Sequence, residues 1–206
     1  MNQTRRAAMV CSLSFFIFLT LPSIAKEKKM ERLADREALV RLAAILCPGD
    51  AKLLEEVLLA AEHPKEYFAK FEDDLFERGI ETPERVSFWL ALVDALAKRK
   101  YVREVDWKDQ GIELAHTLRL LSARYNVKLD LSRLEKLGEG YDLTPKYADL
   151  MISILKPNGL TLIWFDIDSD SYPLCIVPST RVAEIQALAR RLAHRILVFD
   201  RNSGDI

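Results

Sequence analysis

Three short apolar runs near the carboxyl end constrain the fold of this chain more than any other feature. Residues 160–165, 174–177 and 196–199 carry apolar side chains on both of their alternating faces. A strand that is covered on one face only alternates apolar and polar residues, whereas a strand buried on both faces is apolar throughout. The runs therefore predict three strands of a central sheet that has other layers packed on each side.

The connections between these runs predict how the strands are joined. The first two runs are close enough in sequence to pair as a β-hairpin. A helix capped by Ser179 or Thr180 and reaching to about His194 separates the second run from the third. If those two strands are parallel, they form a right-handed βαβ unit with this helix. We therefore expect a small, mixed C-terminal β-sheet.

Upstream of Gly159 the apolar residues recur at helical spacing instead. Residues 101–107 alternate weakly and predict an extended link or a short edge strand. The chain shows no repeat and no flexible linker, so we expect a single α+β domain over residues 26–206, with an N-terminal helical block packed on the sheet. The expected helices cover residues 31–46, 51–62, 64–79, a segment from Thr82 to about Ala97, 109–125, 131–137 and 144–156.

The first 25 residues have the three regions of a secretory signal peptide. Arg5 and Arg6 precede the apolar run 7–21, and Ser23 to Ala25 places small residues before the predicted cleavage site. The run is shorter than the roughly 20 residues of a membrane-spanning helix, so we expect no stable membrane span after cleavage. The mature protein would be periplasmic or secreted. The alternative is a cytoplasmic protein whose translation starts at Met30.

Charge and motif content exclude several classes of function. Thirty basic residues against 31 acidic ones give a net charge of −1, which lacks the positive field of a nucleic-acid-binding protein. The three histidines share no metal-ligand spacing, and no glycine-flanked nucleophilic serine is present. The sequence thus predicts no catalytic residue, no metal ligand and no cofactor. His194 is expected to interact with a helix dipole, and Lys98 to Lys100 to form a solvated helix end.

Two cysteines remain outside the leader, Cys47 and Cys175. One interpretation is a pair of buried free thiols that behave as small apolar residues. The other is a disulfide that forms in an oxidising compartment. The sequence leaves both open.

The stretch from Asp166 to Pro173 is the most unusual part of the chain, because it places aspartates at three alternating positions after a buried strand. A calcium loop of the EF-hand type is excluded, since Ser171 replaces its glycine and Val177 its bidentate glutamate. The order of Asp166 and Asp168 resembles the start of the haloacid-dehalogenase family, which implies a nucleophile and an acid/base. Asp170 departs from that pattern, and only about 40 residues follow, too few for the later motifs of that family.

Two further interpretations of this stretch remain. The first is a hairpin turn in which aspartate and serine side chains bond to nearby main-chain amides. The second is a recognition surface for a protein partner with a basic surface. We therefore expect a non-enzymatic binding protein that presents an acidic turn, and the alternative is a metal-dependent hydrolase that uses Asp166 and Asp168. The candidate binding residues are Asp166, Asp168, Asp170, Ser171 and Tyr172.

Residues 159–174, together with residues 67–80 and 89–94, resemble a bacterial domain family of unknown function. The resemblance covers about residues 35–200. It implies no activity, cofactor or catalytic residue, and it marks residues 168–172 as the expected signature. Members of such a family are expected to lack a leader, so residues 1–25 depart from the pattern and keep the cytoplasmic alternative open.

Overall fold

The computed structural model describes residues 21–106, 109, 111–137 and 145–199. The chain divides into two compact units, residues 1–37 and 38–206, and helix α1 (Leu21–Leu46) contributes to both. Residues 1–20 of the predicted leader lie outside the described residues. Cleavage after Ala25 stays a prediction. Within the described part of the chain, no helix combines the length and the apolar character needed to cross a membrane.

The second unit contains a four-stranded sheet with the order β1-β3-β2-β4. Its strands are β1 (Arg103–Asp106), β2 (Leu160–Phe165), β3 (Ser171–Pro178) and β4 (Ile196–Val198). The predicted β2–β3 hairpin is confirmed, with Ile163 opposite Cys175. Residues 101–107 do contain an edge strand, β1, which pairs with β3.

The α+β class is confirmed, but the prediction of a mixed sheet is wrong, because all three strand pairs are antiparallel. β3 and β4 run in the same direction and are joined through helix α9 (Val182–Arg191), yet they do not pair. The far edge of β3 is already occupied by β1, so β4 pairs with the free edge of β2. The βαβ unit is therefore split, with β2 between its two strands.

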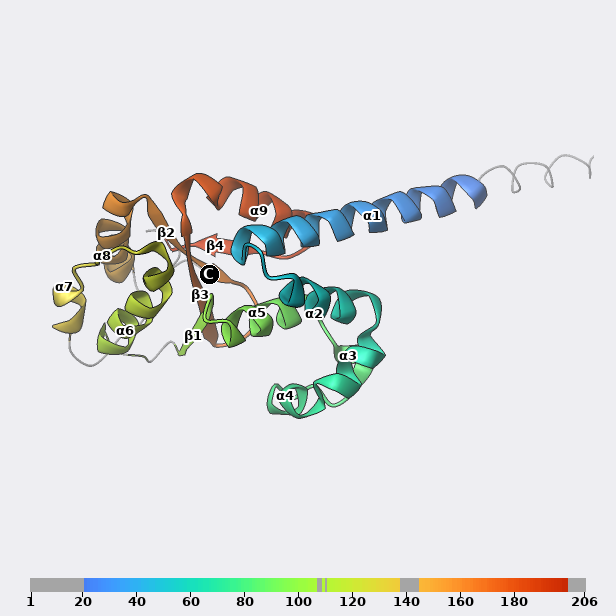
Figure 1. The fold of residues 1–206 in the computed structure, drawn as a ribbon, viewed down its shortest axis with the longest axis horizontal. Coiled ribbons are helices and arrows are strands. Elements are labelled where there is room, and N and C mark those ends of the chain that lie inside the picture. The colour runs from blue at the N-terminus through green and yellow to red at the C-terminus, as the bar shows by residue number, and fades with distance from the viewer. Residues whose placement is uncertain (1–20, 107–108, 110, 138–144, 200–206) are drawn as a thin grey trace, which may run out of the picture. The chain divides into compact units, whose positions relative to one another are not determined.

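Both faces of the sheet are covered, as the apolar runs predict. On β2, Ile163 and Phe165 belong to one core cluster, while Leu162 and Trp164 belong to another on the opposite face. The alternating side chains of one strand thus enter two separate cores. Figure 1 shows the strands between the group α6, α7 and α8 on one side and the group α2, α5 and α9 on the other.

The first core is completed by residues 38–46 of α1 together with α2 (Ala51–Glu62), α5 (Phe88–Lys98) and α9. Asp50 caps α2 as predicted, since its Oδ1 accepts a hydrogen bond from the Leu53 amide at 2.8 Å. Helix α5 begins later than predicted. Pro83–Arg85 forms only a 3₁₀ turn, and Ser87 provides the cap by accepting from the Leu90 amide at 3.4 Å.

The predicted helix 64–79 is divided into α3 (Pro64–Lys70) and α4 (Glu72–Glu77). Phe71 leaves the helical conformation, and its ring packs 4.6 Å from that of Tyr67. Gly79 ends α4 with a φ of 69°, which confirms its predicted role as a left-handed stop. These helices form a third, smaller core with Ala60 and Ala91.

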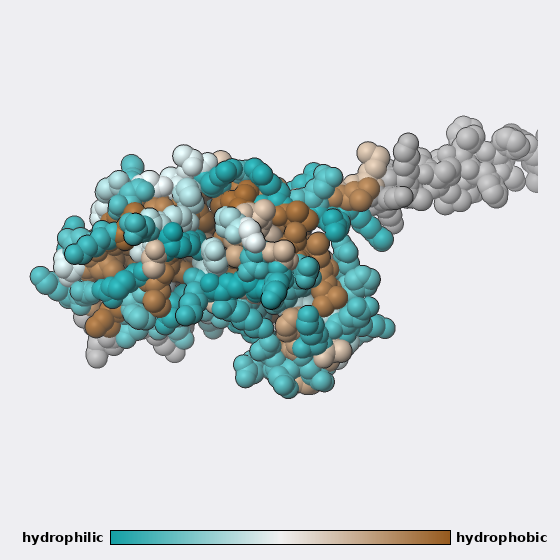
Figure 2. All heavy atoms as spheres, viewed as in Figure 1, coloured by the Kyte–Doolittle hydropathy of each residue, from teal (hydrophilic) through white to brown (hydrophobic). Residues whose placement is uncertain are grey.

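The second core is covered by α6 (Gly111–Ser122), α7 (Ser132–Glu135) and α8 (Pro145–Leu155). A side chain at Gly111 would meet the Leu134 carbonyl oxygen at 2.4 Å, so glycine permits the close approach of α6 to α7. Helix α6 ends earlier than predicted, in a 3₁₀ turn that is followed by left-handed Asn126. Figure 2 shows that hydrophilic residues cover most of the visible face of the described chain.

Candidate functional site

The acidic turn, residues 166–172, joins β2 to β3. Asp166 follows the last residue of β2, and Ser171 and Tyr172 are the first two residues of β3. Asp168, Ser169 and Asp170 are exposed at the tip, whereas the residues on either side of them are half-buried. The five candidate residues are thus close together, but only two of the three aspartates face the solvent.

Asp166 is occupied within the protein. Arg195 donates from Nε and Nη2 to its Oδ2 at 2.8 and 2.6 Å, and Oδ1 accepts the Asp168 amide at 3.3 Å. The Asp166 amide donates to the Arg195 carbonyl at 3.1 Å, and the Trp89 indole donates to the Asp166 carbonyl at 2.8 Å. Both carboxylate oxygens are therefore engaged, and Asp166 acts as an anchor for the turn.

The main chain at the tip is fixed by local contacts. Asp168 has a φ of 52°, in the left-handed region that aspartate tolerates better than most residues. The Ser169 hydroxyl accepts a hydrogen bond from the Ser171 amide at 3.3 Å. These are the side-chain to main-chain bonds of a hairpin turn. Among the described residues, no ion pair neutralises the carboxylates of Asp168 or Asp170.

Tyr172 belongs to the second core. Its ring packs edge-on against Trp164 with centroids 5.2 Å apart, and the residue is half-buried. Its ring surface is thus partly used in holding β3 against β2. The exposed part of the acidic turn consists mainly of Asp168, Ser169 and Asp170.

Three residues that support the turn are absent from the sequence-based candidates: Trp89, His194 and Arg195. The His194 ring stacks on Trp89 at 4.5 Å with an interplanar angle of 1°, and Phe88 contacts it edge-on at 5.4 Å. Burial lowers the pKa of His194, and the negative charges of Asp166 and Asp168 oppose this shift. The side-chain role expected for His194 was a dipole interaction, whereas the observed contacts are aromatic.

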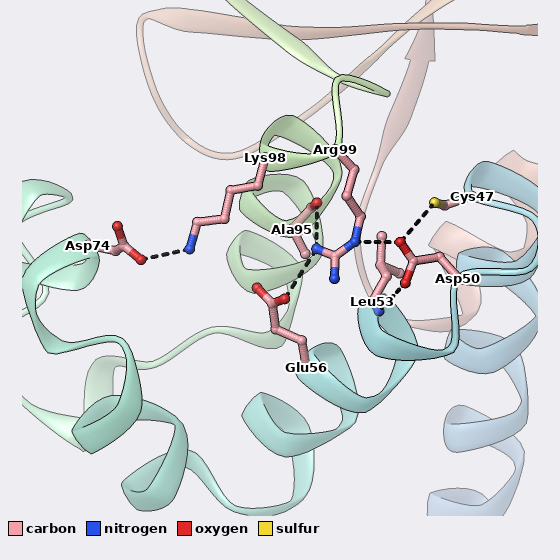
Figure 3. A network of polar contacts seen from close by, with 8 residues as sticks. All are labelled: Cys47, Asp50, Leu53, Glu56, Asp74, Ala95, Lys98 and Arg99. Carbon is pink, nitrogen blue, oxygen red and sulfur yellow. Dashed lines mark hydrogen bonds and ion pairs between the residues drawn. The ribbon is translucent and has the colours of Figure 1, made fainter. Parts of the chain in front are cut away.

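A second polar cluster joins α2 to α5 (Figure 3). Arg99 donates from Nε to Asp50 Oδ2 at 2.7 Å and from Nη1 to Glu56 Oε2 at 3.2 Å. Lys98 Nζ lies 2.6 Å from Asp74 Oδ2. The prediction of a solvated helix end is wrong for Arg99, whose side chain is only 21% exposed. The cluster links helices to one another, and both of its cations are paired.

The two cysteines are free and buried. The Cys47 thiol lies 3.9 Å from Asp50 Oδ2, and Arg124 Nη2 lies 3.5 Å from the sulfur of Cys175. Burial raises the pKa of both thiols, so both are protonated at neutral pH. The interpretation as free thiols is confirmed, and neither cysteine has the thiolate character of a nucleophile.

No group of three or more histidine, cysteine, aspartate or glutamate residues is placed to hold a metal ion in the described part of the chain. The acidic turn presents two exposed carboxylates, those of Asp168 and Asp170, on a main chain that local contacts hold. Such a site suits charge recognition.

The model of one protein family, described as "Domain of unknown function (DUF6630)", matches residues 38–200. The chain belongs to this family. The DUF6630 match begins at the first residue of the second compact unit and includes the acidic turn with all its anchors. The expected resemblance to a domain family of unknown function is thus confirmed, while its bacterial origin and the expected signature at residues 168–172 stay predictions. Comparison with curated proteins and with solved structures gives no match.

The Trp89 hydrogen bond predicts a difference between two tryptophan substitutions. Trp89→Phe leaves the Asp166 carbonyl without its donor, whereas Trp164→Phe removes an indole N–H that has no partner among the described residues. We expect Trp89→Phe to lower the free energy of unfolding by about 1–3 kcal/mol more than Trp164→Phe does. Urea denaturation of both variants measures the difference, and equal losses would contradict the anchoring role of Trp89.

The burial of His194 predicts a pH dependence. Because its pKa is lower in the folded chain, the unfolded chain binds the proton more readily. Its contribution to stability is therefore complete above the ordinary histidine pKa of about 6.5 and is lost as pH falls below that value. The free energy of unfolding of the unchanged chain is expected to fall as the pH is lowered from 7.5 to the pKa that His194 has in the folded chain. We expect this fall to be smaller in the variant His194→Gln.

The control for this measurement is His63→Gln, because the His63 side chain is 58% exposed and its ring lies 3.8 Å from the Glu66 carboxylate. Subtracting each variant's pH profile from that of the unchanged chain removes the shared carboxylate titrations. A His194→Gln profile parallel to that of the unchanged chain would show that burial of the imidazole has no energetic consequence.

Proposed function

We propose that this protein is a non-enzymatic binding protein, and that the acidic turn contacts a partner with a basic surface. The observation that carries the proposal is the pair of exposed carboxylates, Asp168 and Asp170, on a turn whose main chain is held by Trp89 and Arg195. A recognition loop that is already ordered loses little conformational entropy on binding.

The charge arrangement of the turn supports the same proposal. Arg195 neutralises Asp166, which is the least exposed of the three aspartates, and leaves the two outer charges to the solvent. Exposed carboxylates act mainly by accelerating encounter and by fixing the orientation of a basic partner. The positions of Asp168 and Asp170 at the tip make them the first groups of the turn that an approaching surface meets.

The metal-dependent hydrolase, our alternative, uses Asp166 and Asp168 as metal ligands or as acid/base. In the structure Asp166 Oδ2 is held by Arg195 and Oδ1 by a main-chain amide. A metal ion or a substrate would have to compete with these donors for the carboxylate. No observation at the turn favours this alternative.

We further propose that residues 1–25 are an export signal of the bacterial type and that the mature protein is periplasmic or secreted. The support is the order of basic, apolar and small residues before Ala25. The family match begins at residue 38, so the proposed signal lies outside the matched domain. Initiation at Met30 would also leave the matched domain whole, and the two alternatives give different mature chains.

The binding proposal predicts the behaviour of the double variant Asp168→Asn, Asp170→Asn. We expect it to lose a partner that the unchanged chain captures by crosslinking in the native cell. Because both side chains are exposed, we expect the melting temperature to change little. Quantitative mass spectrometry of the crosslinked complexes, beside thermal unfolding, measures the two effects.

The matched control is Glu55→Gln with Glu81→Gln, which removes two exposed carboxylates elsewhere on the same unit. Loss of the same partner from the control would mean that net charge, rather than the turn, is recognised. Unchanged capture by the turn variant would refute the proposal. A large drop in its melting temperature would assign Asp168 and Asp170 to holding the turn.

The export proposal predicts the amino terminus of the mature protein. We expect a chain that begins at Lys26, and Ala25→Arg is expected to block its formation because a large charged residue does not fit the cleavage site. Intact-mass measurement of protein from the periplasm and the cytoplasm tests this. A cytoplasmic protein that begins at Met30 would establish the alternative start.

A further inference from the structure

The segment from Val127 to Leu131 has the pattern of a strand but lies outside the sheet. It follows left-handed Asn126, contains no helix, turn or bend, and leads into α7. Its odd-numbered residues are buried or half-buried and contribute to the second core, while Lys128 and Asp130 are exposed. This alternation is that of an extended chain with one covered face.

The main chain of this segment is largely unpaired with the described residues, apart from the Leu131 carbonyl, which accepts from the Leu134 amide at 2.9 Å. No main-chain hydrogen bond joins residues 127–130 to any other described residue, although most N–H and C=O groups in folded proteins are paired. All five residues of the segment line a cavity of about 730 Å³, whose other walls come from α6, the 3₁₀ turn after it, and α7. The segment therefore resembles an edge strand that has space beside it.

The sequence of the segment, Val-Lys-Leu-Asp-Leu, is self-complementary in the antiparallel direction. If two copies pair about Leu129, Lys128 of each copy lies opposite Asp130 of the other. Opposite charges at directly facing positions stabilise an antiparallel pair. An arrangement in which the same surface of both copies meets itself is that of a two-fold symmetric dimer.

We propose that two copies of this protein associate through antiparallel pairing of their Val127–Leu131 segments. The charges needed for this pairing are present. Asp130 Oδ1 accepts from the Ser132 amide and hydroxyl at 3.1 and 2.7 Å, which lowers the pKa of Asp130 and keeps it ionised while Oδ2 stays available. Lys128 is exposed and has no ion-pair partner among the described residues.

The size of the contact sets its expected strength. A stable dimer interface buries on the order of 1,200–2,000 Å², and a pair of five-residue segments covers less than that. We therefore expect a reversible association that increases with protein concentration. The segment lies in the α6–α7 connection, whereas the acidic turn joins β2 to β3, so self-association and the proposed partner binding can be tested separately.

Charge reversal provides the test. The variants Lys128→Asp and Asp130→Lys each place like charges opposite each other in both symmetric pairs, and we expect each alone to weaken self-association about tenfold or more. An equimolar mixture of the two variants restores opposite charges at every pair. Sedimentation velocity of the full-length chains, singly and mixed, is expected to show two monomeric variants and a dimeric mixture.

The controls are Lys52→Asp and Glu55→Lys, which make the same charge changes at exposed positions on α2. These should associate like the unchanged chain, and so should Asp168→Asn with Asp170→Asn. The proposal is overturned if the unchanged chain stays monomeric to millimolar concentration, if the Lys128 and Asp130 variants dimerise like it, or if their mixture stays monomeric. Circular dichroism confirms that each variant is folded.

Discussion

Burial of the β2–β3 hairpin on both faces is the constraint on which the rest of the second unit depends. Each strand sends alternate side chains into two different cores, so neither helical layer can be removed without exposing half of the hairpin. Phe165 and Ile163 meet α5 and α9, and Leu162 and Trp164 meet the α6–α8 layer. Because apolar burial is the largest favourable contribution to folding, the hairpin determines where the helices of the first and second cores pack.

The acidic turn is stable because it lies at the end of this buried hairpin. Its anchors come from two other elements: Trp89 from α5, and Arg195 from the link between α9 and β4. Both elements are already positioned by the first core, and the turn adds apolar contacts of its own, from Ile167 to the first core and from Tyr172 to the second. Exposed carboxylates are thereby supported by a rigid base, which is the arrangement that a recognition loop requires.

Much of this fold could be predicted from local patterns. The doubly apolar runs predict a sheet covered on both faces, Asp50 predicts the start of α2, and Gly79 predicts the end of α4, because each depends on residues close in sequence. The errors arise where a distant contact decides. Phe71 interrupts a helical pattern in the third core, where Lys98 Nζ of α5 lies 4.9 Å from the centre of its ring. β4 pairs with β2 because β1 occupies the edge of β3.

The candidate site, too, could be predicted only where it depends on residues that are close in sequence. The aspartates and serines of the turn are visible in the sequence, but their different roles are not, since Asp166 meets a guanidinium 29 residues away and an indole 77 residues away. Trp89 looks like an ordinary core residue on α5. Arg99 looks like part of an exposed basic run, because nothing near it in sequence reveals Asp50 and Glu56 on α2.

The order of the elements along the chain also affects how this protein is made. Helices α2 and α5 leave the ribosome well before the hairpin that covers their apolar faces, since chains are synthesised from the amino end. Until residue 177 has emerged, the first core lacks Ile163, Phe165, Cys175 and Val177. The nascent chain therefore carries uncovered apolar helices until the hairpin has emerged, and such transiently exposed apolar surface is prone to aggregation.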